Sequence, residues 1–72
     1  MAQNSKTQVP DPTYNLISAL YHTLSAADLY DQYIADAEES GDEELATYFK
    51  ETQSAARDTA LKARELLASR LK

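Results

Sequence analysis

The sequence predicts an all-α protein: a two-helix antiparallel hairpin that dimerises into a four-helix bundle. Apolar residues recur every three or four positions through two long segments, which is the spacing of amphipathic helices. Gly41, the single glycine of the chain, separates these segments. Each segment is about 29 residues, or about 43 Å at 1.5 Å per residue, so the two match as the arms of a hairpin.

The first helix is expected over about residues 12–40. Asp11 supplies a capping side chain, and Pro12 suits the first helical position because the N–H it lacks would have no partner there. Residues 1–10 are mostly polar and are expected to form a disordered tail before a hairpin spanning 11–72. The predicted inward stripe of this helix is Leu16, Leu20, Leu24, Ala27, Tyr30, Ile34 and Ala37.

The turn is expected at residues 40–42, followed by a second helix over about 43–71. Gly41 can adopt the left-handed conformation that ends a helix, and Asp42 can cap the next one. Glu43 and Glu44 then lie in the first turn, where the positive end of the helix dipole favours them. The predicted inward stripe is Leu45, Phe49, Thr52, Ala56, Thr59, Ala63 and Leu66.

A hairpin of this size needs additional stabilisation. The chain has 72 residues and no cysteine, so its core is small and disulfides are excluded. Apolar neighbours such as Leu66 and Leu67 make each face wider than a two-helix contact covers, which favours a homodimer. The residues expected in the core or the dimer interface are Leu16, Leu20, Leu24, Ala27, Tyr30, Ile34, Leu45, Phe49, Ala56, Ala63 and Leu66.

The distribution of charge favours an antiparallel dimer. Between Thr7 and Phe49 there are nine acidic residues and no basic one, whereas from Lys50 onward there are six basic and three acidic residues. An antiparallel pair places each acidic turn beside the basic end of the partner. A competing interpretation is that the basic residues of the second helix only complement its own dipole; these are Arg57, Lys62, Arg64 and Arg70.

The spacing of Tyr30, Gly41 and Phe49 resembles the helix-pair core of the rubrerythrin branch of the ferritin-like superfamily. The resemblance spans about residues 16–67 without a gap. Small and apolar residues between the three positions contribute to it: Ala35, Ala37, Leu45 and Ala46. The resemblance implies a bundle that, in the family, holds a carboxylate-bridged di-iron centre built from a glutamate on one helix and Glu-x-x-His on the other.

This chain departs from the family pattern at every ligand position. Thr23 occupies the position of the glutamate on the first helix. The segment 56-ARDT-59 occupies the position of Glu-x-x-His, with Ala56 in place of the glutamate and Thr59 in place of the histidine. These side chains do not supply the carboxylate or imidazole that iron binds. We therefore expect no metal site, no cofactor and no catalytic residue, and we expect that the chain is not an enzyme.

Other candidate ligands have simpler interpretations. His22 has Ala26 and Leu29 at helical spacing and no carboxylate, so we expect a solvent-facing or interface histidine. Asp28 and Asp31 are expected to be solvated, although Asp31 lies at the border of the stripe and could face a basic residue of another subunit. An acidic patch at the turn lacks the spacing of a calcium-binding loop, and its members are Asp36, Glu38, Glu39, Asp42, Glu43 and Glu44.

Composition excludes several function classes. A net charge of −5 disfavours nucleic-acid binding, and no apolar run approaches the roughly 20 residues of a membrane span, so a cytoplasmic protein is expected. The N-terminal decapeptide lacks the features of a signal peptide. Two hypotheses remain: a non-catalytic self-assembling or protein-interaction module, which the sequence favours, and a degenerate metal-binding or oxidoreductase protein with iron at a subunit interface, held through His22, Asp28, Asp31 or the acidic turn.

Overall fold

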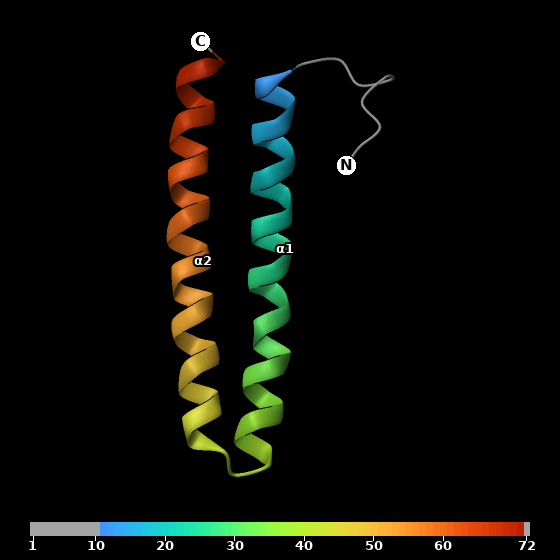
Figure 1. Cartoon of the computed structure of the whole chain (residues 1–72), viewed down its shortest axis with the longest axis vertical. Coiled ribbons are helices and arrows are strands. Elements are labelled where there is room, and N and C mark those ends of the chain that lie inside the picture. Colours follow the sequence, from blue (N-terminus) through green and yellow to red (C-terminus); the bar gives the residue numbers. More distant parts are fainter. Residues whose placement is uncertain (1–10, 72) are drawn as a thin grey trace.

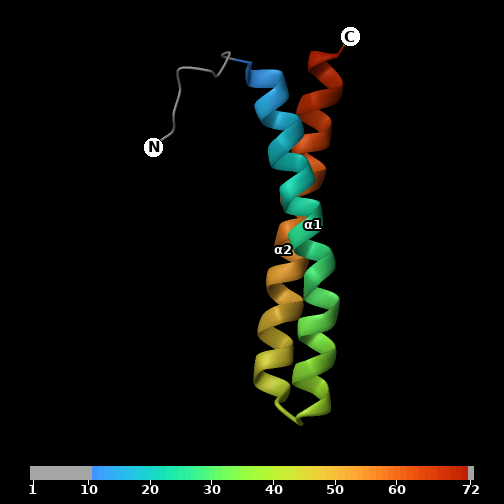
Figure 2. The same ribbon diagram turned by 90° about the vertical axis from the view of Figure 1, so that its right-hand side faces the viewer.

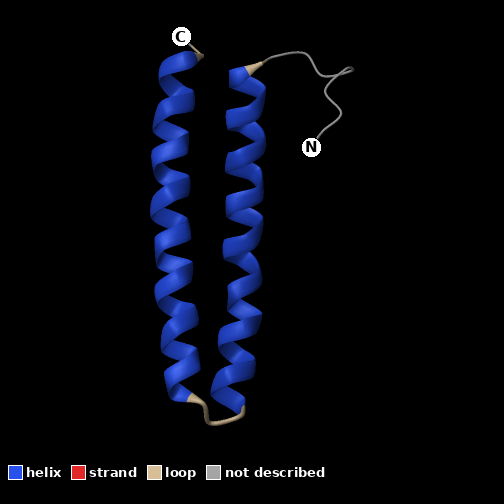
Figure 3. Ribbon diagram, viewed as in Figure 1, coloured by secondary structure: helices blue, strands red, loops and turns tan. Residues whose placement is uncertain are grey.

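The protein is a hairpin of two long antiparallel helices. A computed structural model describes residues 11–71, and the predicted tail at residues 1–10 lies outside this range. Helix α1 spans Pro12–Glu39 and helix α2 spans Glu43–Arg70. The helices lie side by side along their whole length, and the described part of the chain contains no strand (Figure 1, Figure 3). The all-helical hairpin predicted from the sequence is confirmed.

Aspartate side chains cap both helices at their N-termini. Oδ1 of Asp11 accepts a hydrogen bond of 3.0 Å from the backbone N–H of Tyr14, and Oδ1 of Asp42 accepts one of 3.0 Å from Leu45. Pro12 occupies the first helical position of α1. Each cap satisfies an N–H group that has no partner within its own helix.

The turn that joins the helices is a Schellman motif. The N–H of Asp42 donates to the carbonyl of Ala37 at 2.9 Å, and the N–H of Gly41 donates to the carbonyl of Glu38 at 3.0 Å. This pair of hydrogen bonds requires a left-handed residue between them, and Gly41 has φ +78°. The chain reverses within three residues because glycine adopts this conformation without steric strain.

Alanines form the centre of the contact between the helices. The buried apolar residues of the described chain are Ala27 and Ala37 of α1 and Ala46 and Ala60 of α2, each at most 4% exposed. Methyl side chains allow the two backbones to approach closely, and the helices cross at a shallow angle (Figure 2). Larger side chains pack around this line without being fully buried: Leu16, Leu20, Tyr30, Ile34, Phe49 and Leu67.

Three leucines of the predicted inward stripes are exposed in the hairpin. Leu24, Leu45 and Leu66 are 41%, 40% and 44% exposed. Thr23 takes the place of Leu24 on the inner face of α1, where it is half-buried.

In α2 the stripe that faces α1 is shifted by one residue from the predicted one at several levels. The residues that face α1 include Ala46, Ala60 and Leu67 in place of Leu45, Thr59 and Leu66. At Ala46 the shift follows from size, because the closely spaced backbones accept alanine at the centre of the contact and leave the larger Leu45 at its edge.

Gln53 is the one buried polar residue among the described residues, and it is 7% exposed. Its side-chain amide crosses from α2 to α1, where Nε2 donates to the carbonyl oxygen of Ala27 at 2.8 Å and to Oδ1 of Asp31 at 2.9 Å. The two acceptors lie one helical turn apart on α1. This amide therefore fixes the position of one helix along the other.

Candidate interaction surface

The three positions that would carry iron ligands in a ferritin-like protein differ in burial. Thr23 and Ala56 are half-buried in the contact between the helices, whereas Thr59 is exposed at its edge. Thr52 lies one turn before Ala56, and its Oγ1 donates a hydrogen bond of 2.9 Å to the backbone carbonyl of Tyr48 in the preceding turn. These positions act as helix packing and helix surface in the single chain.

The other candidate ligands on α1 are all exposed. His22 is exposed, and its ring stacks edge-on against the adjacent Tyr21 with centroids 5.4 Å apart. Asp28 is exposed, while Asp31 accepts the hydrogen bond from Gln53. Within residues 11–71, no three histidine or acidic side chains are grouped closely enough to hold a metal ion.

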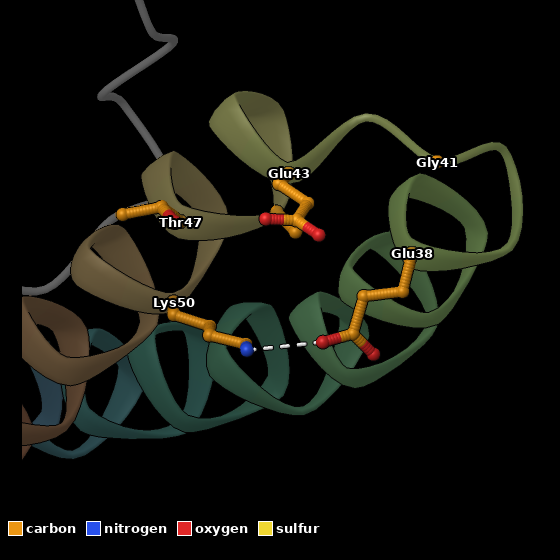
Figure 4. A pocket seen from close by; sticks show the side chains of 6 residues that line it. Glu38, Gly41, Glu43, Thr47 and Lys50 are labelled. Atoms are coloured by element: carbon orange, nitrogen blue, oxygen red, sulfur yellow. Dashed lines mark ion pairs between the residues drawn. The ribbon is translucent and has the colours of Figure 1, made fainter.

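The acidic turn carries an exposed ion pair. Nζ of Lys50 lies 3.0 Å from Oε2 of Glu38, and both side chains are more than half exposed. Figure 4 shows Lys50 reaching across from α2 toward Glu38 of α1. The pair borders a shallow pocket of about 310 Å³, and the residues that line it are Glu38, Gly41, Glu43, Ala46, Thr47 and Lys50. This pocket is polar, open and small, and it presents both signs of charge.

Large apolar side chains are concentrated on the surface of the hairpin. No large side chain of the described residues is fully buried, whereas eleven are exposed. Examples are Leu29 at 56%, Tyr48 at 57% and Leu61 at 53% exposed. A monomeric helical domain normally turns such side chains into its core, so this exposure is unusual for a helical domain that has no partner.

Two long faces flank the contact between the helices, one on each side. The first is named here the low-charge face, and its charged residues are Asp36 and Lys62. It begins at an apolar groove of about 320 Å³ beside the turn, which Tyr33, Leu45 and Phe49 help to line. Residues at spacings of three and four from Tyr33 and Leu45 continue the face along both helices. Its members are Ala19, His22, Ala26, Leu29, Tyr33, Asp36, Leu45, Tyr48, Thr52, Ala55, Thr59, Lys62 and Leu66.

The opposite face is named the ion-pair face, because it carries the Glu38–Lys50 pair. Helical spacing from these two residues adds five more charged positions to it, with exposed Tyr, Ile and Leu residues near the chain termini. Its charged members are Asp28, Asp31, Glu38, Glu43, Lys50, Arg57 and Arg64. The low-charge face therefore has two charged residues where this face has seven.

Aromatic rings anchor the low-charge face to the inside of the hairpin. Phe49 contacts Tyr30 edge-on with centroids 5.9 Å apart, and it also contacts Tyr33 at 5.6 Å and Tyr48 at 5.7 Å. The cluster runs from the half-buried Tyr30 and Phe49 to the exposed Tyr48. A rigid aromatic group that extends from core to surface is a common anchor of protein interfaces.

The sequence did not predict the buried hydrogen bonds of Gln53. It predicted wide apolar faces, but it did not divide them into two separate surfaces. A glutamine among apolar residues interrupts the helical pattern. The neighbouring residues do not indicate that its hydrogen-bond partner is Asp31, 22 residues earlier in the chain. The low-charge face did have a signal in the sequence, since Tyr33 and Ala55 lie directly beside predicted stripe residues and Leu66 is a predicted stripe residue itself. Which side of the contact each residue lies on follows only from the tertiary structure.

Comparison with known proteins adds no family to these observations. The chain matched no protein-family model, no curated protein and no solved structure. In the part of the chain that is described, neither helix has the length and apolar character needed to span a membrane.

Proposed function

We propose that this protein is a non-catalytic self-assembly module in which two hairpins pair into a four-helix bundle of the ferritin-like kind. The observation that carries the proposal is the inverted distribution of apolar side chains. The hairpin core is built on alanines, while eleven large apolar residues are exposed on its surface. A second copy would bury many of them, and a fully buried leucine contributes roughly 1.5–3 kcal/mol relative to an exposed one.

The residues in the contact between α1 and α2 also support the proposed dimer, because they bury little apolar surface. Ala27, Ala37, Ala46 and Ala60 supply the buried apolar area, and alanine buries little surface per residue. Two-helix hairpins with such thin cores gain most of their stability from packing against further helices. In this proposal the positions that bind iron in ferritin-like proteins serve helix packing, so the chain works as a scaffold and presents its remaining surface to other proteins.

The oligomeric state tests the proposal directly. Sedimentation equilibrium of the full chain should give about twice the monomer mass of 8.0 kDa, and the midpoint of thermal unfolding should rise with protein concentration. A chain that stays monomeric and fully helical at high micromolar concentration, with a midpoint independent of concentration, contradicts it. The non-catalytic part is tested separately, by metal analysis of protein from iron-supplemented cells, where stoichiometric iron or absorption from an oxo-bridged centre would overturn it.

A further inference from the structure

We propose that the low-charge face binds the same face of a second copy, with α1 against α1 and α2 against α2, each pair antiparallel. This inference rests on the proposed dimer and assigns its interface. The low-charge face has two charged positions along the full hairpin, against seven on the ion-pair face. Burial of unpaired charge is costly, so the low-charge face is the one that a partner hairpin can cover at least cost.

Four residues of α2 on this face are placed symmetrically about a point near the middle of the helix. Leu45 and Leu66 are equally distant from a point between residues 55 and 56, and so are Thr52 and Thr59. An antiparallel pair of α2 helices centred there places each leucine on the partner's leucine and each threonine on the partner's threonine. A two-fold interface requires this kind of self-complementary pattern, since the same patch must fit itself.

Residues of α1 give the same arrangement about Ala26. The positions equally distant from Ala26 on this face are Ala19 and Tyr33. An antiparallel pair centred at Ala26 places the ring of Tyr33, which is 39% exposed, over the partner's Ala19. Large side chains then meet small ones, as close packing of helices requires, and Ala26 meets its own copy on the two-fold axis.

The two centres fall at the same height of the hairpin, although each was located from its own helix. The amide of Gln53 reaches both Ala27 and Asp31, so Gln53 is level with about the midpoint of these two residues. Because the helices are antiparallel, the centre between residues 55 and 56 is level with residues 26–27 of α1. One two-fold axis therefore satisfies both helix pairs.

Charge at the two ends of the hairpin favours the antiparallel orientation. The half nearest the turn, residues 27–56, holds nine acidic residues and one lysine, a net charge of −8. The opposite half, residues 11–26 with 57–71, holds three acidic and four basic residues, a net charge of +1. An antiparallel dimer places each −8 half beside a +1 half, whereas a parallel dimer places the two −8 halves together.

Single cysteines test this geometry cleanly because the chain contains none of its own. Ala26→Cys should form a covalent dimer on mild oxidation, since the two copies of position 26 meet at the axis. Ala19→Cys is the matched control on the same face. Its two copies would be about 14 residues apart along the helices, or about 21 Å, and should not link. Ser54→Cys lies at mid-height on the opposite face and should also stay reduced.

Two matched leucine substitutions, one on each face, test without cross-linking which face forms the dimer interface. Leu29 on the low-charge face and Leu61 on the ion-pair face are 56% and 53% exposed, and both are in mid-helix. Leu29→Glu should weaken dimerisation more than about tenfold, as expected when a charge enters an interface, whereas Leu61→Glu should change it by less than about threefold. Circular dichroism establishes that both variants remain helical.

The outcomes separate this inference from the proposed function. Covalent dimers from Ala26→Cys but from neither control, with selective dissociation of Leu29→Glu, support the assigned face and orientation. Linking of Ala19→Cys would indicate parallel α1 helices, and linking of Ser54→Cys would indicate the ion-pair face; either result overturns the inference while the dimer stands. A monomeric wild-type chain overturns the inference and the proposed function together.

Discussion

Gln53 of α2 donates a hydrogen bond of 2.9 Å to the carboxylate of Asp31 on α1, and the same amide donates to the carbonyl of Ala27. The buried apolar residues along the line between the helices are all alanines. Sliding one helix by a turn would leave the buried amide without these acceptors, at a cost of roughly 1–3 kcal/mol. Gln53 therefore favours the observed register of the two helices.

We expect Gln53→Ala to lower the free energy of unfolding by about 1–2 kcal/mol. It removes two hydrogen bonds and leaves a gap at a position that is 7% exposed, although the higher helix propensity of alanine offsets a few tenths of this. Urea unfolding at a fixed protein concentration measures the change. Gln32→Ala is the control, because the Gln32–Asp36 hydrogen bond of 2.7 Å is exposed, and its loss should cost less than about 0.5 kcal/mol. Equal losses in the two variants would show that Gln53 has no special role.

Gly41 gives a second prediction. Substitution by alanine should destabilise the hairpin by about 1–2 kcal/mol, because φ at this position is +78° and a β-carbon disfavours left-handed backbone. A β-carbon would meet no atom within 4 Å, so the cost is conformational and not steric. Gly41→Asn should therefore lose less stability than Gly41→Ala, since asparagine tolerates this conformation better. A neutral Gly41→Ala variant would contradict the Schellman turn.

The cap at Asp42 should contribute about 1 kcal/mol. Its Oδ1 accepts the 3.0 Å hydrogen bond from Leu45, and Asp42→Ala removes this acceptor at the start of α2. Asp42→Asn retains a cap oxygen and should lose only a few tenths of a kcal/mol. Thermal unfolding of the three proteins, followed by circular dichroism at 222 nm and equal concentration, gives the comparison. If the asparagine variant loses as much as the alanine variant, charge and not the hydrogen bond is responsible.

The Lys50–Glu38 pair should contribute little. Its side chains are 56% and 52% exposed, so water and salt screen the attraction between them. Lys50→Met and Glu38→Gln should each change the free energy of unfolding by less than about 1 kcal/mol, and a double-mutant cycle at low salt should give a coupling below about 0.5 kcal/mol. A coupling of several kcal/mol would mean that the pair is buried in the assembled protein.

Phe49 is the residue of the aromatic cluster whose loss we expect to be the most damaging. Phe49→Ala removes the contacts with Tyr30, Tyr33 and Tyr48 together and should lower the free energy of unfolding by about 3 kcal/mol. Phe49→Leu retains much of the volume and should cost about half as much. Denaturant unfolding measures both, and a cost below 1 kcal/mol for the alanine variant would show that the ring is not part of the core.

The local features of the hairpin could be read from short stretches of sequence. Asp11 with Pro12, and Gly41 with Asp42, act on backbone groups within a few residues of themselves, so their roles follow from geometry that is the same in any helix. The inner stripe of α2 was harder to predict. Leu45 and Ala46 are both apolar neighbours, and hydrophobicity alone favours the larger one, whereas the closeness of the two backbones favours the smaller.

The candidate surface could be predicted only in outline. The sequence predicts wide apolar faces beside Leu66 and Tyr30. Their separation into a low-charge face and an ion-pair face depends on which residues of each helix face the other helix, and only the structure gives this. The resemblance to ferritin-like proteins, and the loss of ligands at Thr23, Ala56 and Thr59, remain predictions that metal analysis and the oligomeric state will test.

The ends of the helices and the sharp turn between them follow from the amino-acid sequence, because caps and a left-handed glycine act through bonds between near neighbours. The tertiary structure decided which side chains lie between the helices, since that depends on the distance between two backbones. It also decided that Gln53 bonds to Asp31, because a hydrogen bond between residues far apart in the chain exists only once the register is fixed.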